Sequence, residues 1–451
     1  MKIAIFTDTF YPEINGVTTF LNNFIKHFSQ NHVIRIYAPK YKTRNELKFN
    51  KNVTIYRCSS FSLLTNKSTR VSMPNVIKML VDCKKFNPDI IHIHTPAIIG
   101  TLGLYYGKLF KKPIVATYHT YFPDFLVYLS PIKIVKELLK LLNKKIRIKK
   151  KDKDYELTIK RIKRMNKKIR NSEVLKRFKK INKIKRIPKS LVWLLTGIFY
   201  NNCDLVTTPS MTFVNILSEH KIKKPIVYLS NGIELDLFKY KERNKKDDNF
   251  TFLYVGRLGF EKNVDVVIKA INILIKKGYD IKLIIVGDGP AKEELEKLVK
   301  LLRIERFVTF TGAINRDNLI TYYHNADVFV TASTIETQGI VVLEAMATGM
   351  PIIGVRKLAL KELIIDNYNG FLAEPFNAKD MADKCEILIK HKELIKEFSK
   401  NSYLIAKKHD INSTMKKLER IYNSLINSRK RKIKRKEKIL YFKKKVKMIN
   451  V

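Results

Sequence analysis

Short apolar runs rich in β-branched residues alternate with longer amphipathic stretches along almost the whole chain. The clearest runs read IAIF, IIHIH, IVATY, FLYVG, LIIVG and VFVTA. Parallel strands buried on both faces give such runs, and the helices that connect them give the amphipathic stretches. The alternation therefore predicts the α/β class, with parallel sheets covered by helices.

The length of 451 residues is too great for one ordinary domain. We therefore expect two doubly wound domains, with the polar segment 237–249 as the linker between them. In the first half, strands are predicted near 2–7, 33–38, 53–57, 89–94, 114–118, 204–208 and 226–229. In the second half they are predicted near 251–256, 281–286, 307–311, 327–332 and 351–355.

Two segments carry most of the net charge of +47. Residues 141–190 hold 22 basic and 4 acidic residues, and residues 427–451 hold 12 and 1, which together give +29. Such segments suit a polyanionic partner, either an anionic membrane leaflet or a nucleic acid. A second interpretation stays open, because the chain is rich in Lys, Ile and Asn, and an AT-rich genome would produce that bias without any binding role.

The segment 142–190 lacks glycine, and its apolar residues recur at loose helical spacing. It is predicted to be a basic helical insertion, which is either a solvated hairpin without a partner or a contact with anionic lipid. The tail at 429–447 repeats this pattern around an apolar centre, ILYF. Nucleic acid is the less favoured partner, since Tyr155 and Phe178 are the only aromatic residues of 141–190 that could stack on bases.

The remaining composition indicates a cytoplasmic protein without metal or disulfides. The four cysteines are scattered and form no CxxC pair, so neither a zinc site nor a disulfide framework is indicated. The start of the chain shows no signal-peptide pattern. The apolar stretch 191–200 is far shorter than the roughly 20 residues of a spanning helix. We therefore expect a peripheral protein at the inner membrane surface.

Two loops of the first half follow predicted strands, at the end of a parallel sheet where ligands bind. After the first strand, TDTFYPEINGV contains Gly16, which would let the backbone approach an anion at a helix start; a bare turn is the alternative. After IVATY comes His119, which is either a site residue or a structural histidine. The phosphate-binding patterns GxxxxGK[ST] and GxGxxG are absent from the expected places.

The second half holds two stronger patterns. Arg257 and Lys262 follow the strand FLYVG, and two cations there suit a diphosphate, although a surface charge pair is the alternative. In ETQGIVVLEAMATGMP, Glu336 and Glu344 lie eight residues apart, with Gly339 between them at an expected helix start. Carboxylates can accept hydrogen bonds from sugar or ribose hydroxyls, while cations and helix amides hold phosphate. These features outline a nucleotide-sugar site.

The segments SNGIELDLF, YVGRLGFEK, VGDGP, ADVFVTAS and the E-x7-E pattern, in this order, resemble the retaining glycosyltransferases of family four. The resemblance covers about residues 1–140 and 191–425. It implies the GT-B architecture, in which two Rossmann-like domains face one another across a cleft. The NGV turn, the YHT sequence and the ETQG form look most like diacylglycerol glucosyltransferases and their close relatives.

The resemblance also implies roles for the candidate residues. Arg257 and Lys262 would neutralise the donor diphosphate and assist catalysis, and Glu344 would bind the ribose. The sugar would be held by Glu336 and by the backbone amides of Gly339, Ile340 and Val341. Gly16 would lie beside the phosphates, and His119 would contact the transferred sugar. No metal and no cofactor are expected, and Asn15 stands where the family usually has a glycine.

The resemblance also divides the chain into an N-terminal acceptor-side domain and a C-terminal nucleotide-sugar-binding domain. The predicted parts are 1–232 with the insertion at about 142–190, 233–405, a crossover helix at 406–427 and a basic tail at 428–451. The predicted enzyme is a retaining, metal-independent hexosyltransferase acting on a membrane lipid, with UDP-glucose and 1,2-diacylglycerol favoured. Alternatives are a GDP-mannose or UDP-sugar transferase acting on a phosphoinositide, a polysaccharide or a soluble acceptor, a non-catalytic relative and, more remotely, a nucleic-acid-binding protein.

Overall fold

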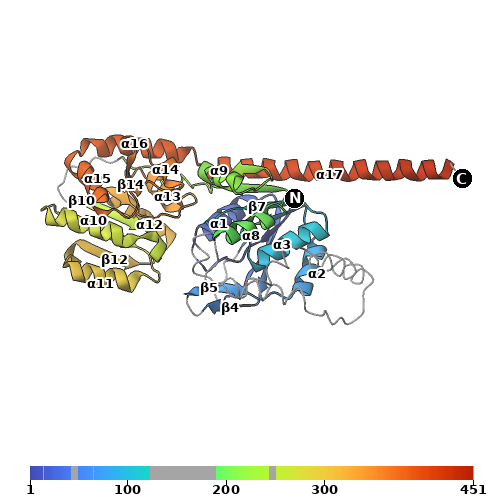
Figure 1. Ribbon diagram of the computed structural model, residues 1–451, viewed down its shortest axis with the longest axis horizontal. Helices are drawn as coiled ribbons and strands as arrows, with labels where there is room; N and C mark the ends of the chain where they lie inside the picture. The colour runs from blue at the N-terminus through green and yellow to red at the C-terminus, as the bar shows by residue number, and fades with distance from the viewer. Residues whose placement is uncertain (14, 42–48, 64–65, 122–188, 243–249, 450–451) are drawn as a thin grey trace. The chain divides into compact units, whose positions relative to one another are not determined.

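The computed structural model describes the chain except for residues 14, 42–48, 64–65, 122–188, 243–249 and 450–451 (Figure 1). The chain forms two compact units. Unit 1 comprises Met1–Thr207, Leu217–Val227 and Leu418–Val451, and unit 2 comprises Thr208–Ile216 and Tyr228–Lys417. The basic insertion predicted for 142–190 lies outside the described residues except for its last two positions.

Unit 1 contains a seven-stranded sheet in the order β3-β2-β1-β6-β7-β8-β9. Its strands are β1 (Lys2–Phe6), β2 (Val33–Pro39), β3 (Val53–Cys58), β6 (Ile90–Ile93), β7 (Ile114–Thr117), β8 (Leu205–Thr208) and β9 (Ile226–Tyr228). A separate hairpin joins β4 (Ser60–Leu63) and β5 (Asn66–Ser72). The helices are α1 (Gly16–Phe28), α2 (Val76–Phe86), α3 (Ile98–Leu109), α8 (Lys189–Tyr200), α9 (Met211–Glu219) and α17 (Ile411–Ile449), of which α9 and α17 also contribute residues to unit 2.

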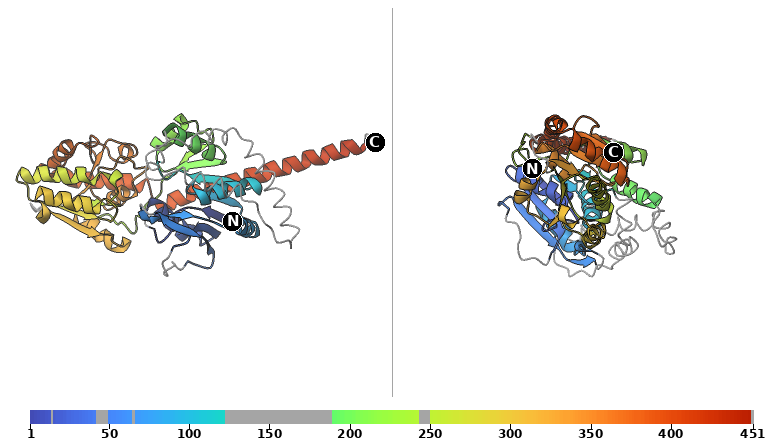
Figure 2. Two further views of the ribbon diagram at one scale, coloured as in Figure 1. Left: turned by 60° about the horizontal axis from the view of Figure 1, so that its bottom comes forward. Right: turned by 90° about the vertical axis from the view of Figure 1, so that its left-hand side faces the viewer.

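Unit 2 contains a six-stranded sheet in the order β12-β11-β10-β13-β14-β15. Figure 2 shows most of this unit in colours from yellow to orange-red. Its strands are β10 (Phe250–Val255), β11 (Ile281–Val286), β12 (Val308–Gly312), β13 (Val328–Val330), β14 (Ile352–Val355) and β15 (Gly370–Ala373). The helices are α10 (Val264–Lys276), α11 (Lys292–Leu302), α12 (Arg316–Asn325), α13 (Ile340–Ala347), α14 (Leu360–Leu363), α15 (Ala378–Lys390) and α16 (Glu393–Lys407), with short 3-10 turns at Phe260–Lys262 and Glu305–Phe307.

The sheets confirm the predicted α/β class with two doubly wound units. Neighbouring strands of both sheets pair in parallel, as between β1 and β6 and between β10 and β13. In each sheet the order of strands reverses once, between β1 and β6 in unit 1 and between β10 and β13 in unit 2. Ligands of open α/β sheets bind at such switch points, beyond the carboxyl ends of the strands.

Asparagine residues start several of the helices. Asn15, Asn75, Asn315 and Asn377 precede α1, α2, α12 and α15, and each side chain accepts a hydrogen bond from a backbone amide of the first turn. An asparagine in this position satisfies a donor that has no partner inside the helix. The Asn-rich composition thus has a structural use beside any genomic bias.

The structure divides two of the connections differently from the expected parts. The main part of unit 2 begins at Tyr228 rather than at 233, and the predicted linker 237–249 begins inside unit 2, where Phe238 is fully buried in the core. Residues 243–249 of that segment lie outside the described residues. A single helix was expected over 406–427, but α16 ends at Lys407 and α17 begins at Ile411.

The break between α16 and α17 has a clear physical cause. The backbone of Ile233 donates to His409 O at 2.8 Å and accepts from Ile411 N at 3.0 Å, so the chain leaves the helix to pair with the segment around Ile233. The Asp410 side chain then accepts a hydrogen bond from Ser413 N at 2.9 Å and caps the new helix. The far end of α17 extends beyond the sheet of unit 1 (Figure 1).

Within the ranges described, no helix is both long and apolar enough to cross a lipid bilayer. The association with a membrane surface stays a prediction.

Gly232 is required where the chain meets the start of α17. It has φ +77°, and an added Cβ would lie 2.4 Å from Ile411 Cδ1. We expect Gly232→Ala to lower the free energy of unfolding of unit 2 by about 3 kcal/mol, from the left-handed backbone and the overpacking together. Differential scanning calorimetry measures the loss.

Gly278→Ala is the matched control for this substitution. Gly278 has φ +90°, but nothing lies within 4 Å of its added Cβ. Its cost should be confined to the backbone term of about 1–2 kcal/mol. Equal losses in the two variants would show that the contact with Ile411 contributes nothing.

Candidate functional site

The candidate residues of unit 2 lie in loops at the switch point of its sheet. Arg257 follows β10, Lys262 ends the 3-10 turn Phe260–Lys262, and Glu336 lies in the loop between β13 and α13. Because β10 and β13 are neighbours, their carboxyl ends bring these loops together. The structure therefore places Lys262 beside Glu336, the first predicted carboxylate, with Arg257 in the same loop as Lys262.

Lys262 and Glu336 form an ion pair, with 2.5 Å between Nζ and Oε1. Their side chains are only 20% and 16% exposed. Burial by itself raises the pKa of Glu336, but the neighbouring Lys262 outweighs it and brings the pKa below its usual range. Glu336 is therefore ionised at neutral pH, and its charge is balanced at the position predicted for a diphosphate and a sugar.

Arg257 also has a carboxylate partner, because its guanidinium donates to Glu261 in the adjoining turn. The hydroxyl of Tyr254 on β10 donates to Arg257 O at 3.3 Å and ties this loop to the strand. Glu261 was not singled out from the sequence, although it lies in the GRLGFEK segment that carries the two cations.

Glu344, the second predicted carboxylate, lies within α13 and is 5% exposed. Its Oε2 accepts a hydrogen bond from the hydroxyl of Tyr323 at 2.9 Å, and its Oε1 lies 4.0 Å from Arg316 Nη2. Arg316 also donates to Glu234, the second acidic group beside it. Burial raises the pKa of Glu344 to about 7, more than Arg316 and Tyr323 lower it.

The start of α13 offers backbone donors between the two carboxylates. Gly339 has φ +93°, a conformation that glycine adopts at little cost, and it turns the chain into the helix. The first amides of a helix, here those of Ile340 and Val341, have no acceptor inside it. Together with the positive end of the helix dipole they form an anion-binding position.

Gln338 fixes the loop just before this helix. Its Nε2 donates to Ser230 Oγ at 2.8 Å, and its Oε1 accepts from Asn231 N at 2.9 Å. The side chain is 2% exposed, so these hydrogen bonds form away from solvent. Sequence reasoning did not single out Gln338, because its partners lie more than a hundred residues away.

In unit 1, Gly16 is the first residue of α1, as the turn predicted. The expectation that the following amides are open to an anion needs correction, because Asn15 Oδ1 accepts hydrogen bonds from Val17 N and Thr18 N, both at 3.0 Å. Asn15, which stands where the family usually has a glycine, thus occupies donors that an anion could otherwise use. The placement of Gly16 beside the phosphates stays a prediction.

His119 lies just after β7, two residues past Thr117, and its Nε2 is 2.9 Å from Nδ1 of His94. Burial lowers the pKa values of His92 and His94 well below their usual range, so both are neutral. His92 in turn pairs with Thr117 and with Tyr422 of α17. The alternation in IIHIH is the signal that could have predicted two histidines on one face of this strand.

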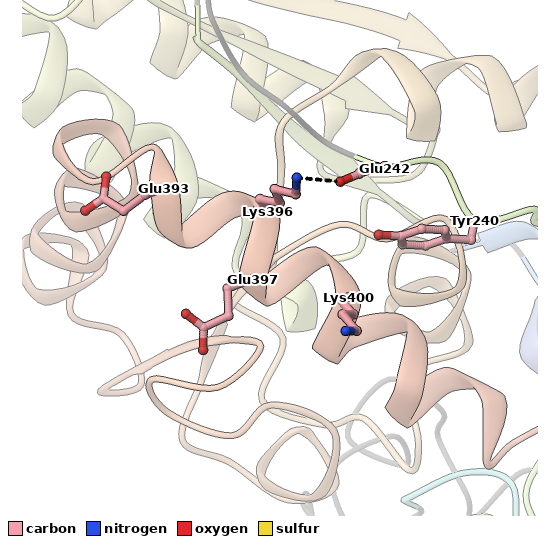
Figure 3. Close-up of a pocket in the computed structure, with 6 residues that line it drawn as sticks. All are labelled: Tyr240, Glu242, Glu393, Lys396, Glu397 and Lys400. Atoms are coloured by element: carbon pink, nitrogen blue, oxygen red, sulfur yellow. Dashed lines mark ion pairs between the residues drawn. The ribbon is translucent and has the colours of Figure 1, made fainter.

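A pocket of about 290 Å³ lies elsewhere in unit 2, beside α16 (Figure 3). None of the candidate residues lines it. Its charged side chains include an ion pair of 2.9 Å between Lys396 and Glu242, and its lining consists of Tyr240, Glu242, Glu393, Lys396, Glu397 and Lys400. Its three carboxylates outnumber its two ammonium groups, so the pocket does not suit the diphosphate of a nucleotide sugar, and we assign the function to the switch point instead.

Comparisons with known proteins identify the family of this chain. Residues 14–237 match the family Glycosyltransferase Family 4, and residues 238–405 match the family Glycosyl transferases group 1. The alpha-monoglucosyldiacylglycerol synthase of Streptococcus pneumoniae is 28% identical over 82% of this chain and 75% of its own length. The enzyme of the same name from Acholeplasma laidlawii is 26% identical over 97% of this chain and 100% of its own length.

A solved structure shows the same fold. HepE of Anabaena, crystallised in complex with UDP and glucose, superposes with a TM-score of 0.65 at 16% identity, covering 94% of this chain and 100% of that chain. The two family matches together span residues 14–405, which include every candidate site residue. The chain therefore belongs to the family four glycosyltransferases and has the GT-B fold.

Proposed function

We propose that this glycosyltransferase moves glucose from UDP-glucose to a membrane lipid such as 1,2-diacylglycerol, with retention of configuration and without a metal ion. The names of the two relatives, both alpha-monoglucosyldiacylglycerol synthases, support the sugar, the acceptor and the α linkage. The structural neighbour that binds UDP and glucose agrees with the donor. The observation that carries the proposal is the Lys262–Glu336 pair beside the start of α13 at the switch point.

In this proposal the residues of unit 2 bind the donor. Arg257 and Lys262 neutralise the diphosphate, and the amides at Gly339, Ile340 and Val341 add donors from the helix start. Glu336, ionised at neutral pH, accepts hydrogen bonds from sugar hydroxyls. Glu344 accepts hydrogen bonds from the ribose hydroxyls.

The transfer step follows from these roles. The acceptor hydroxyl attacks the anomeric carbon on the face from which the nucleotide leaves. As the bond between that carbon and the diphosphate oxygen breaks, the new carbon–oxygen bond forms, and the leaving phosphate takes the proton of the acceptor hydroxyl. Lys262 and Arg257 stabilise the charge that develops on the diphosphate. In unit 1, Gly16 is proposed to lie beside the phosphates and His119 to contact the transferred sugar.

The proposed location is the cytoplasmic face of the inner membrane, with peripheral attachment. The basic segments 142–190 and 429–447 would bind anionic lipid, each basic residue near the surface contributing about 1 kcal/mol. Most of the first segment lies outside the described residues, so this part of the proposal rests on the sequence.

Release of nucleotide from UDP- and GDP-sugars tests the proposal, with and without diacylglycerol in anionic vesicles. We expect turnover of UDP-glucose that depends on the lipid and is abolished by Glu336→Ala. Glu397→Ala, which removes an exposed carboxylate of the same unit, should retain full activity. Nucleotide release that does not depend on lipid would contradict the proposed lipid acceptor. Turnover of a GDP-sugar alone would contradict UDP-glucose as the donor.

A further inference from the structure

Arg257 and Lys262, the two cations of the proposed donor site, each form an ion pair with a carboxylate of the protein. Lys262 is paired with Glu336, for which the proposed function gives a role towards the sugar. Arg257 is paired with Glu261, for which it gives none. Glu261 therefore needs an explanation of its own.

The fold makes room for the Glu261 carboxylate at one glycine. A Cβ added to Gly259 would lie 2.3 Å from Glu261 Oε1 and 2.5 Å from Oε2. The backbone of Gly259 is extended, with φ −94°, so any residue could adopt its conformation. An alanine at 259 would instead displace the Glu261 carboxylate, because its methyl group would overlap both oxygens. A glycine at 259 thus allows the Glu261 carboxylate to occupy its place beside Arg257.

The two partners differ in their access to solvent. The Glu261 side chain is 12% exposed, whereas that of Arg257 is 38% exposed. A ligand can therefore reach the guanidinium while the carboxylate is held against the turn. The two ion pairs lie at one edge of the sheet, because Arg257, Glu261 and Lys262 follow β10 and Glu336 follows the neighbouring strand β13.

We propose that Glu261 is an internal counter-ion, which takes the place of the donor diphosphate on Arg257 when the site is empty and thereby sets the affinity for nucleoside diphosphates. The inference rests on the proposed role of Arg257. A diphosphate carries more charge than one carboxylate and displaces it; when the product leaves, Glu261 returns to Arg257 and competes with rebinding. Glu261 in this way weakens the retention of the nucleotide product.

Titration calorimetry with UDP and GDP tests the proposal on the full-length protein. Glu261→Gln keeps the shape of the side chain and removes its charge, so we expect UDP to bind about fivefold more tightly, the size of a partly exposed ion pair. Gly259→Ala should act in the same direction, because its methyl group displaces the carboxylate. Binding of uridine, which has no phosphate, should be unchanged in both variants.

Two further variants separate this effect from a general change of charge. In an Arg257→Gln background, Glu261→Gln should no longer tighten UDP binding, because the partner of the carboxylate is gone. Asp265→Asn removes a similar carboxylate from the pair that Asp265 forms with Lys269 on α10, and it should leave the affinity for UDP as it was.

The outcomes separate the inference from the proposed function. If the unmodified protein binds UDP and Glu261→Gln binds it equally or more weakly, Glu261 is no counter-ion and the inference is overturned. If the unmodified protein binds neither UDP nor GDP, the proposed donor site is wrong and the inference is overturned with it. Tighter UDP binding in both Glu261→Gln and Gly259→Ala, absent for uridine, would establish it.

Discussion

Replacing Lys262 by methionine is expected to slow sugar transfer at least about 100-fold at saturating donor and lipid. In the proposed function the ammonium group lies where negative charge develops on the departing diphosphate, and methionine keeps most of the length of the side chain without its charge. The effect should therefore fall mainly on kcat, with a smaller rise in the KM for the donor. Steady-state release of UDP in the presence of vesicles measures both.

The control for this substitution must address stability, because Glu336 loses its partner in a poorly exposed position. Leaving one charge of such a pair alone is strongly destabilising. The double variant Lys262→Met with Glu336→Gln removes both charges and should fold normally while staying inactive. Lys269→Met, which breaks an exposed pair of 2.7 Å with Asp265, should keep full activity. More than a tenth of normal kcat in Lys262→Met would contradict the role of Lys262.

The parallel sheets could be predicted because buried strands have a strong local signature. Each predicted strand is present, as in IAIF at β1 and LIIVG at β11. The strands that were missed lack this signature: β15 reads GFLA, without a β-branched residue, and the β4–β5 hairpin is largely polar. Edge and hairpin strands are fixed by their neighbours, which a local pattern does not contain.

The connections were harder to predict, because their structure depends on distant partners. The segment around Phe238 is polar and suggests a linker, but one aromatic side chain buried in the core ties it to unit 2. The break before α17 depends on the backbone of Ile233, nearly two hundred residues earlier. The crossover helix at 406–427 was expected from the resemblance to the family, which does not show where this helix begins.

The candidate site was predicted to the extent that its residues lie in loops after strands. Arg257, Lys262 and Glu336 come together because neighbouring parallel strands end at one edge. The sequence did not predict how the charges are paired. The partners Arg316 and Tyr323 of Glu344 come from another helix, and only the folded chain shows that they surround it. The pKa of Glu344 likewise depends on burial, which no spacing reveals.

Replacing Glu344 by glutamine is expected to raise the KM for the donor by roughly 10- to 100-fold, the loss of charge-assisted hydrogen bonds to the ribose. In the unmodified enzyme the donor affinity should rise as the pH increases through about 7, because only the ionised carboxylate accepts hydrogen bonds with both oxygens. In Glu344→Gln this dependence should disappear. Donor KM values measured between pH 6 and 8 test the point; a KM independent of pH in the unmodified enzyme would contradict the ribose role.

The free energy of unfolding should fall as the pH rises, whereas the affinity for the donor should rise. The folded pKa of Glu344, about 7, exceeds the ordinary value of 4.5, so the native protein keeps a proton that the unfolded chain has lost. Its contribution to stability is therefore fully present below pH 4.5 and is lost as the pH rises through 7. Glutamine has no proton to lose, so Glu344→Gln should match the unmodified protein below about pH 4 and exceed it by about 3 kcal/mol at pH 8.

The two effects of Glu344→Gln share one physical origin, which makes their combination a sharper test than either alone. A carboxylate enclosed by Tyr323, Arg316 and Glu234 costs stability when it ionises, and in the proposed function this cost is offset by the binding of the donor. Tyr323→Phe removes one hydrogen bond to the charged form, so it should raise the pKa of Glu344 further and move the pH dependence of donor KM upward. Calorimetry and kinetics should then give one folded pKa for each variant, since stability stops falling with pH at that pKa and the donor KM has its midpoint there. Different values from the two measurements would show that a group other than Glu344 controls the affinity for the donor.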